Sequence, residues 1–244
     1  MYQTCIFDLY GTLIDIHTDE DKVEIWKKLS LFLGYYGAVY QAEELHRAYQ
    51  RIVAKMQKGK DLLSRDGHEA YPEIQIEQVF LKIFQEKQIE IDKKMAVYTG
   101  QFFRTLSTDY IKLYQGTKEL LELLKENGKQ LYLLSNAQRI FAEYEIKALG
   151  IDSYFEGIFI SSDFSYKKPD SRFFEGLIEK YKIAKDTAIM VGNDGVCDIM
   201  GAKRVGLHTL YVHSNISPKE EFVRADYVLE HMDMRKIGEL LIQK

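Results

Sequence analysis

Short, mainly apolar runs alternate with amphipathic stretches along most of the chain. The apolar runs predict buried strands at 4–7, 130–134, 157–160, 187–191 and 207–212. Helices are predicted between them at 117–125 and 171–181, where leucine or aromatic side chains recur on one face. Strands separated by helices predict an α/β fold with a doubly wound, Rossmann-like parallel sheet. The functional loops are then expected at the carboxyl edge of that sheet.

Residues 18–107 follow a different pattern. The segment has no convincing strand but four amphipathic stretches, around 26–33, 45–53, 79–84 and 97–103. Their aromatic side chains are expected to form a core of their own. Residues 61–72 are polar and contain glycine and proline, which predicts a loop. We therefore expect a Rossmann-like core, 1–17 and 108–244, with an inserted helical cap domain, 18–107.

The balance of charge narrows the range of partners. The 244 residues carry a net charge of −4, with a pI near 5.9 and no extended basic tract, so nucleic acid is not an expected partner. A small anionic substrate fits if local cations or a metal reverse the sign of the potential in a cleft. Cys5 and Cys197 form no disulfide framework, and no apolar run resembles a signal peptide or a membrane span. We expect a cytoplasmic protein with no membrane partner.

Reactive polar side chains follow four of the predicted strands. Asp8 ends the first strand and is followed by a loop with Gly11 and Thr12. A carboxylate there can attack an electrophile while loop amides hold the developing charge. Ser135 and Asn136 follow the second strand, where the chain is predicted to open into a helix. The pair is typical of a helix cap, and the unpaired N–H groups of a helix start also suit an anion.

The other two loops bring charge. Lys168 precedes Pro169 and a predicted helix start, and it can neutralise both an attacking carboxylate and an anionic substrate. Lysines are more often solvated. Asn193, Asp194 and Asp198 follow an apolar strand beside glycines. That pattern resembles a site for a hard cation, although it is also common in turns.

Taken in this order, the four loops resemble the haloacid dehalogenase-like hydrolase superfamily, in the branch whose helical cap is inserted just after the first motif. The resemblance covers essentially the whole chain. It is carried by Phe7 to Leu13, Leu134 to Ala137, Lys168 to Asp170, and Gly192 to Ala202.

The resemblance implies a role for each loop. It makes Asp8 the covalent nucleophile and Lys168 the group that orients it. The residues implied to contact the transferred group are Leu9, Tyr10, Gly11, Thr12, Ser135 and Asn136. The implied cofactor is Mg²⁺, held by Asp8, the carbonyl oxygen of Tyr10 and the fourth loop.

Two registers place the metal ligands of the fourth loop differently. Counting back from Gly201 and Ala202 puts Asn193 at the family's metal-binding aspartate. The Asp-x-x-x-Asp spacing makes Asp194 the ligand instead. We favour Asp194, assisted by Asn193 or Asp198.

One residue departs from the phosphatase pattern. Phosphatases of the family carry an aspartate two positions after the nucleophile as general acid, and here that position is Tyr10. A phenol with an ordinary pKa of about 10 suits acid–base exchange near neutrality poorly. Tyrosine at this position is similar to the 2-haloacid dehalogenases, in which the carboxylate displaces halide from carbon without a metal.

Charge in the fourth loop favours a phosphatase. Asp194 adds a third carboxylate near Asp8 and Asp198, and a divalent cation relieves their repulsion. Residues 29–39 contain no arginine for the carboxylate of a haloacid, and Phe174 stands where a dehalogenase is expected to carry tyrosine. We expect a Mg²⁺-dependent phosphatase acting on a small phosphorylated metabolite. The alternatives are a metal-independent 2-haloacid dehalogenase and a low-turnover, phosphate-binding regulatory protein.

Overall fold

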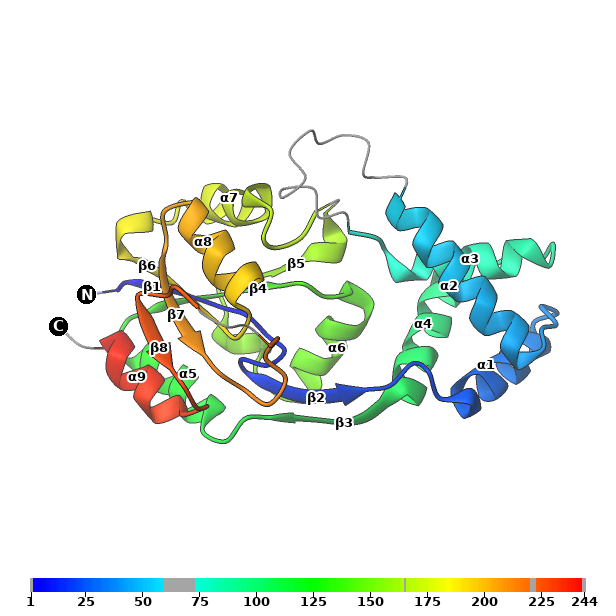
Figure 1. Ribbon diagram of the computed structural model, residues 1–244, viewed down its shortest axis with the longest axis horizontal. Coiled ribbons are helices and arrows are strands. Elements are labelled where there is room, and N and C mark those ends of the chain that lie inside the picture. The colour runs from blue at the N-terminus through cyan, green and yellow to red at the C-terminus, as the bar shows by residue number, and fades with distance from the viewer. Residues whose placement is uncertain (1, 59–72, 165, 220–222, 243–244) are drawn as a thin grey trace.

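A parallel sheet of six strands forms the centre of the computed structural model, which describes residues 2–58, 73–164, 166–219 and 223–242 (Figure 1). Every pairing is parallel, in the order β5–β4–β1–β6–β7–β8. The strands are β1 (Thr4–Phe7), β4 (Gln130–Ser135), β5 (Gly157–Ile160), β6 (Ala188–Gly192), β7 (His208–Val212) and β8 (Tyr227–Leu229). The predicted doubly wound, Rossmann-like fold is confirmed.

Helices cover both faces of this sheet because its strands are apolar on both sides. In β1, Cys5 and Phe7 face one side and Ile6 the other, and all three are fully buried. The first face packs against α5 (Thr117–Glu126), α6 (Arg139–Ala148) and α9 (Met234–Ile242). The second packs against α7 (Ser171–Tyr181) and α8 (Gly201–Arg204). This arrangement leaves the carboxyl ends of β1, β4 and β6 side by side.

Four helices of the described chain form a separate bundle beside the sheet (Figure 1). They are α1 (Val23–Tyr35), α2 (Ala42–Lys58), α3 (Ile76–Glu86) and α4 (Lys93–Ser107). Their shared core includes aromatic side chains, of which Trp26, Phe80 and Phe103 are almost fully buried. The antiparallel strands β2 (Ile14–Thr18) and β3 (Thr108–Leu113) join the bundle to the sheet. We retain the division into a core, 1–17 and 108–244, and a cap, 18–107, as a proposal.

Three strands, β2, β3 and β8, are absent from the sequence prediction, and β8 is only three residues long. β3 and β8 contain no buried residue, and β2 ends in partly or fully exposed positions. The predicted loop at 61–72 lies outside the described residues. No helix within the described ranges is both long and apolar enough to cross a membrane.

Candidate active site

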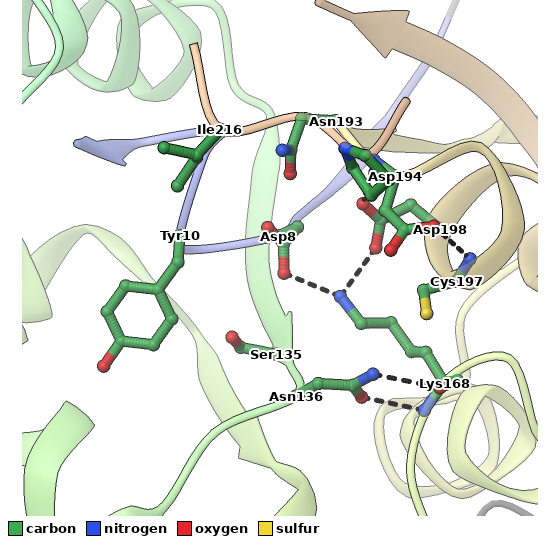
Figure 2. Close-up of a pocket in the computed structure, with 11 residues that line it drawn as sticks. Asp8, Tyr10, Ser135, Asn136, Lys168, Asn193, Asp194, Cys197, Asp198 and Ile216 are labelled. Atoms are coloured by element: carbon green, nitrogen blue, oxygen red, sulfur yellow. Dashed lines mark hydrogen bonds and ion pairs between the residues drawn. The ribbon is translucent and has the colours of Figure 1, made fainter. Parts of the chain in front are cut away.

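A cavity of about 180 Å³ lies where β1, β4 and β6 end (Figure 2). Every described residue that lines it comes from the sheet side of the molecule rather than from α1–α4. These residues are Asp8, Tyr10, Ser135, Asn136, Lys168, Asn193, Asp194, Cys197, Asp198, Ile216 and Pro218. The carboxyl edge of the sheet therefore brings together side chains that are far apart in the sequence.

Lys168 is the electrostatic centre of the cavity. Its Nζ donates to Asp8 Oδ1 at 2.7 Å, to Asp198 Oδ1 at 2.7 Å and to the carbonyl oxygen of Leu134 at 2.8 Å. The side chain is 1% exposed, and a buried ammonium group needs partners of this kind. Burial lowers the pKa of Lys168, but the two carboxylates outweigh burial and raise that pKa above its ordinary value. Lys168 therefore stays protonated and orients Asp8.

The loop after β1 leaves hydrogen-bond donors beside Asp8. Thr12 Oγ1 donates to Asp8 Oδ2 at 3.2 Å, although Thr12 is not among the residues that line the cavity. The backbone N–H groups of Leu9 and Tyr10 have no acceptor among the described residues. An anion bound at Asp8 can accept from those two groups.

The predicted helix start at Ser135 and Asn136 is wrong. The extended strand β4 runs one residue beyond its apolar segment, to Ser135, and α6 begins only at Arg139. After β5, the hydroxyl of Ser161 accepts the N–H of Ala137, and the hydroxyl of Ser162 accepts the N–H of Arg139. These two N–H groups at the start of α6 are therefore not available to an anion. Asn136 instead holds the backbone of Lys168, accepting its N–H at 2.8 Å and donating to its carbonyl oxygen at 2.9 Å.

Ser135 Oγ is a buried polar atom with no hydrogen-bond partner among the described residues. Leaving a hydroxyl buried and unpaired costs about 1–3 kcal/mol. Ser135 lines the cavity beside Asp8 (Figure 2). An oxyanion in the cavity would give this hydroxyl the acceptor that the protein does not supply.

Asp194 and Asp198 are both tied to the chain that follows β6. Asp194 Oδ1 accepts the backbone N–H groups of Val196 and Cys197, at 2.9 and 2.7 Å. Both residues lie in the helical turn Gly195–Met200, so the fourth loop is partly helical. Asp198 Oδ2 accepts the N–H of Asp194 at 3.0 Å, while its other oxygen contacts Lys168. Burial raises the pKa of Asp198 to about 7, with Lys168 acting in the opposite direction.

Asn193 packs directly against the loop that follows β1. Thr12 Oγ1 lies 3.2 Å from Asp8 Oδ2 and 3.4 Å from Asn193 Oδ1, and Asn193 Nδ2 donates to Ser214 Oγ at 3.3 Å. Gly11 has a φ of +85°, and a Cβ at this position would lie 2.3 Å from Asn193 Nδ2. Glycine is therefore required for the first and fourth loops to meet.

The oxygen atoms at this edge of the cavity fit a hard cation such as Mg²⁺. Among the lining residues three carboxylates accompany one ammonium group, so negative charge is in excess. No three His, Cys, Asp or Glu side chains of the described chain come together as a metal centre, and Asp198 is turned onto the lysine. A cation would therefore rely on the carboxylates of Asp8 and Asp194, together with the side-chain oxygen of Asn193 and the backbone carbonyl oxygen of Tyr10. One or two carboxylates completed by water are typical of Mg²⁺.

The Tyr10 side chain extends away from the Asp8 carboxylate (Figure 2). Its hydroxyl donates to Glu145 Oε2 at 2.5 Å, and Glu145 Oε1 accepts from Arg104 Nε at 2.7 Å. Burial and the neighbouring Glu145 raise the pKa of Tyr10 well above its ordinary value. In this position the phenol is a donor to Glu145 and not an acid for a group bound at Asp8.

Sequence reasoning missed Glu145 and Arg104. The two residues lie on different helices, and neither belongs to a motif. One signal was present, because Glu145 occupies the buried face of α6 beside Ala142 and Ile146, where an amphipathic helix is normally apolar.

Comparison with known proteins decides the family. A protein-family model for haloacid dehalogenase-like hydrolases matches residues 2–206. The chain belongs to this family. It is 30% identical over 129 residues to the glyceraldehyde 3-phosphate phosphatase of Pyrococcus furiosus, a match that covers 50% of this chain and only 52% of that enzyme. It is 25% identical over 244 residues to a pyrimidine 5'-nucleotidase of Streptococcus pneumoniae, covering 95% of each chain.

Solved structures of the family share the fold across the whole chain. A phosphatase from Thermococcus onnurineus has a TM-score of 0.59 at 20% identity, covering 98% of this chain and 97% of that one. The 2-haloacid dehalogenase from Pseudomonas syringae has a TM-score of 0.66 at 17% identity, covering 99% and 98%. The fold is thus common to both kinds of enzyme, and the choice between them depends on the site.

Proposed function

We propose that this protein is a Mg²⁺-dependent phosphatase that hydrolyses a small phosphorylated metabolite through a phosphoryl group carried on Asp8. The observation that carries the proposal is a carboxylate held by Lys168 and surrounded by donors without protein partners among the described residues. Such donors suit the oxygens of a phosphoryl group, which would then lie next to the nucleophile. The phosphatase activities of two relatives support the same reaction class and a small phosphorylated substrate.

The reaction has two steps. Asp8 attacks phosphorus, the bond between phosphorus and the leaving oxygen breaks, and the leaving oxygen takes up a proton from solvent water. A second water then attacks the phosphoryl-aspartate and gives a proton back to solvent, which releases phosphate and restores Asp8. The groups that would stabilise the equatorial oxygens are Lys168, Ser135 Oγ and the N–H groups of Leu9 and Tyr10.

The remaining site residues position these groups. Thr12 holds Asp8, and Asn136 and Asp198 hold Lys168. Gly11 lets the fourth loop approach the first.

Mg²⁺ would be held by Asp8, the Tyr10 carbonyl oxygen, Asn193 and Asp194. Bound there, the ion supplies positive charge that offsets the excess of carboxylates and the charge of the substrate.

Tyr10 favours a second candidate function. Its hydroxyl is directed to Glu145, so it provides no proton for a leaving alcohol. Displacement of halide from a 2-haloacid by Asp8 needs neither that proton nor a metal. A phosphate-binding regulatory protein with negligible turnover is the third outcome to be tested.

A panel of substrates with and without metal separates the three functions. The panel holds an aryl phosphate, a triose phosphate, a pyrimidine nucleoside 5'-monophosphate and 2-chloropropionate, each with Mg²⁺ and with excess chelator. We expect phosphate release with Mg²⁺, a loss of about 10²-fold or more in chelator, and recovery when Mg²⁺ is returned. Chloride release that persists in chelator, without phosphate release, would replace the proposal by a dehalogenase. Tight Mg²⁺-dependent binding of a phosphorylated compound without turnover would replace it by a regulatory role.

Ser135→Ala is expected to separate activity from stability. The free energy of unfolding should stay constant or rise, by at most about 1–3 kcal/mol, because an unpaired buried hydroxyl is removed. At the same time kcat/KM should fall about 10²-fold, because the phosphoryl group loses a donor. Denaturant titration and steady-state kinetics measure the two quantities.

Ser162→Ala is the matched control for this variant. Ser162 is equally buried, but its hydroxyl accepts the N–H of Arg139 and lies outside the cavity. The control should lose stability and keep its activity. If Ser135→Ala behaves like the control, Ser135 does not contact the substrate.

A further inference from the structure

We propose that Arg104 and Glu145 are positioning residues of this active site, forming a cap-to-core latch on Tyr10 that sets how often the cap is docked during turnover. The inference rests on the proposed phosphatase function and adds two residues that belong to none of the four loops. Arg104 lies on α4 of the cap, Glu145 on α6 beside the sheet, and Tyr10 on the nucleophile loop.

The contacts converge on the Glu145 carboxylate. Tyr10 donates its hydroxyl to Oε2 at 2.5 Å. Arg104 donates to Oε1 from Nε at 2.7 Å and to Oε2 from a terminal nitrogen at 3.3 Å. The guanidinium carbon also lies 5.6 Å from the ring centre of Tyr10 and 5.3 Å from that of Phe141. Each of the three elements is thus held to the other two.

Burial makes the geometry of this latch specific. The Glu145 side chain is 8% exposed and that of Arg104 is 18% exposed. A carboxylate in such a place is costly unless its partners are correctly oriented, so the buried pair favours one docked position of the cap. The neighbouring contact from Gln101 Nε2 to the Ile140 carbonyl oxygen, at 3.1 Å, involves neutral groups and carries no comparable penalty when broken.

The latch is expected to affect turnover more than binding. All described residues that line the cavity belong to the core, so the phosphoryl group can bind whether or not the cap is docked. Tyr10 is the lining residue that the latch reaches directly. If only the docked state reacts, a lower docked fraction reduces kcat in proportion and leaves KM nearly constant.

The latch can be tested with three variants of the full-length protein, Glu145→Gln, Arg104→Gln and the double variant. Each is assayed with an aryl phosphate and Mg²⁺. Each single variant should lower kcat about tenfold with KM changed by less than about threefold. The double variant should be no slower than the slower single variant, because both changes open the same latch. Arg104→Lys keeps the charge and should recover part of the loss in kcat.

Arg51→Gln is the matched control. Arg51 also donates to both carboxylate oxygens of a glutamate, Glu86, at 2.7 and 2.8 Å, but this pair is more exposed than the latch and lies within the cap between α2 and α3. Its kcat should equal that of the wild type. Single latch variants with wild-type kcat, or a double variant slowed by the product of the single effects, would overturn the latch. Wild-type protein without phosphate release would instead overturn the proposed function, so the two failures are distinct.

Discussion

Asp8→Asn is expected to lose phosphatase activity by a factor of about 10⁴ or more, because an amide cannot form the phosphoryl-aspartate. The fold should persist. Asparagine keeps the size of the side chain and an oxygen for Lys168, and Lys168 also keeps Asp198 and the Leu134 carbonyl oxygen. Kinetics with the most active substrate of the panel measures the loss, and circular dichroism melting tests the fold.

The covalent intermediate gives this prediction a second test. Acid quenching of wild-type protein during turnover should leave one phosphoryl group on the peptide that contains Asp8, detected by mass spectrometry. The variant should carry none. A haloacid would leave an ester on the same side chain, so the mass of the adduct distinguishes the phosphatase from the dehalogenase.

Asp15→Asn controls for the loss of a buried carboxylate. Asp15 is as buried as Asp8, but it accepts from Tyr110 and Asn215 outside the cavity. We expect its activity to stay within about threefold of wild type, the range of a change that does not touch the reacting atoms. Activity of Asp8→Asn above about a tenth of wild type would refute Asp8 as the nucleophile.

The sheet can be predicted from the sequence because its central strands are buried on both faces. In β1 a continuous apolar run is formed by Cys5, Ile6 and Phe7. Such runs are typical of parallel strands that helices cover on both sides. The same reasoning does not predict β2 and β3, because these strands pair with each other outside the main sheet and carry exposed positions, such as His17. Their pairing depends on the segments that lead into and out of the α1–α4 bundle lying side by side, which no local pattern predicts.

Positions in the site were easier to predict than contacts. Asp8, Ser135 and Asn193 each lie at or directly after the end of an apolar strand, and parallel topology alone brings such positions to one edge. The resemblance implies that Asn136 contacts the transferred group, yet its side chain holds the Lys168 backbone, which depends on the conformation of a loop. Glu145 meets Arg104 only because helix α4 packs on α6, and no pattern in the sequence predicts that packing.

Lys168→Met is expected to lower both stability and activity, because one ammonium group is shared by two carboxylates in a place almost closed to water. Lys168 and Asp198 are each 1% exposed, and Asp8 is 7% exposed. Without the cation the two carboxylates remain buried beside each other, which should cost about 3–5 kcal/mol of unfolding free energy. Methionine keeps most of the apolar stem, so the change isolates the charge.

The same variant should lose about 10³-fold in kcat, because Asp8 loses its orientation and the phosphoryl oxygens lose a positive charge. Lys167→Met is the control, since this neighbour is only partly buried and makes no ion pair with the described residues. It should change stability by less than about 0.5 kcal/mol and leave kcat unaltered.

Saturating Mg²⁺ should raise the melting temperature of Lys168→Met more than that of wild type, because the ion then faces carboxylates that no lysine neutralises. Equal shifts in the two proteins would mean that the ion binds away from Asp8, and the metal ligands proposed for this site would be wrong.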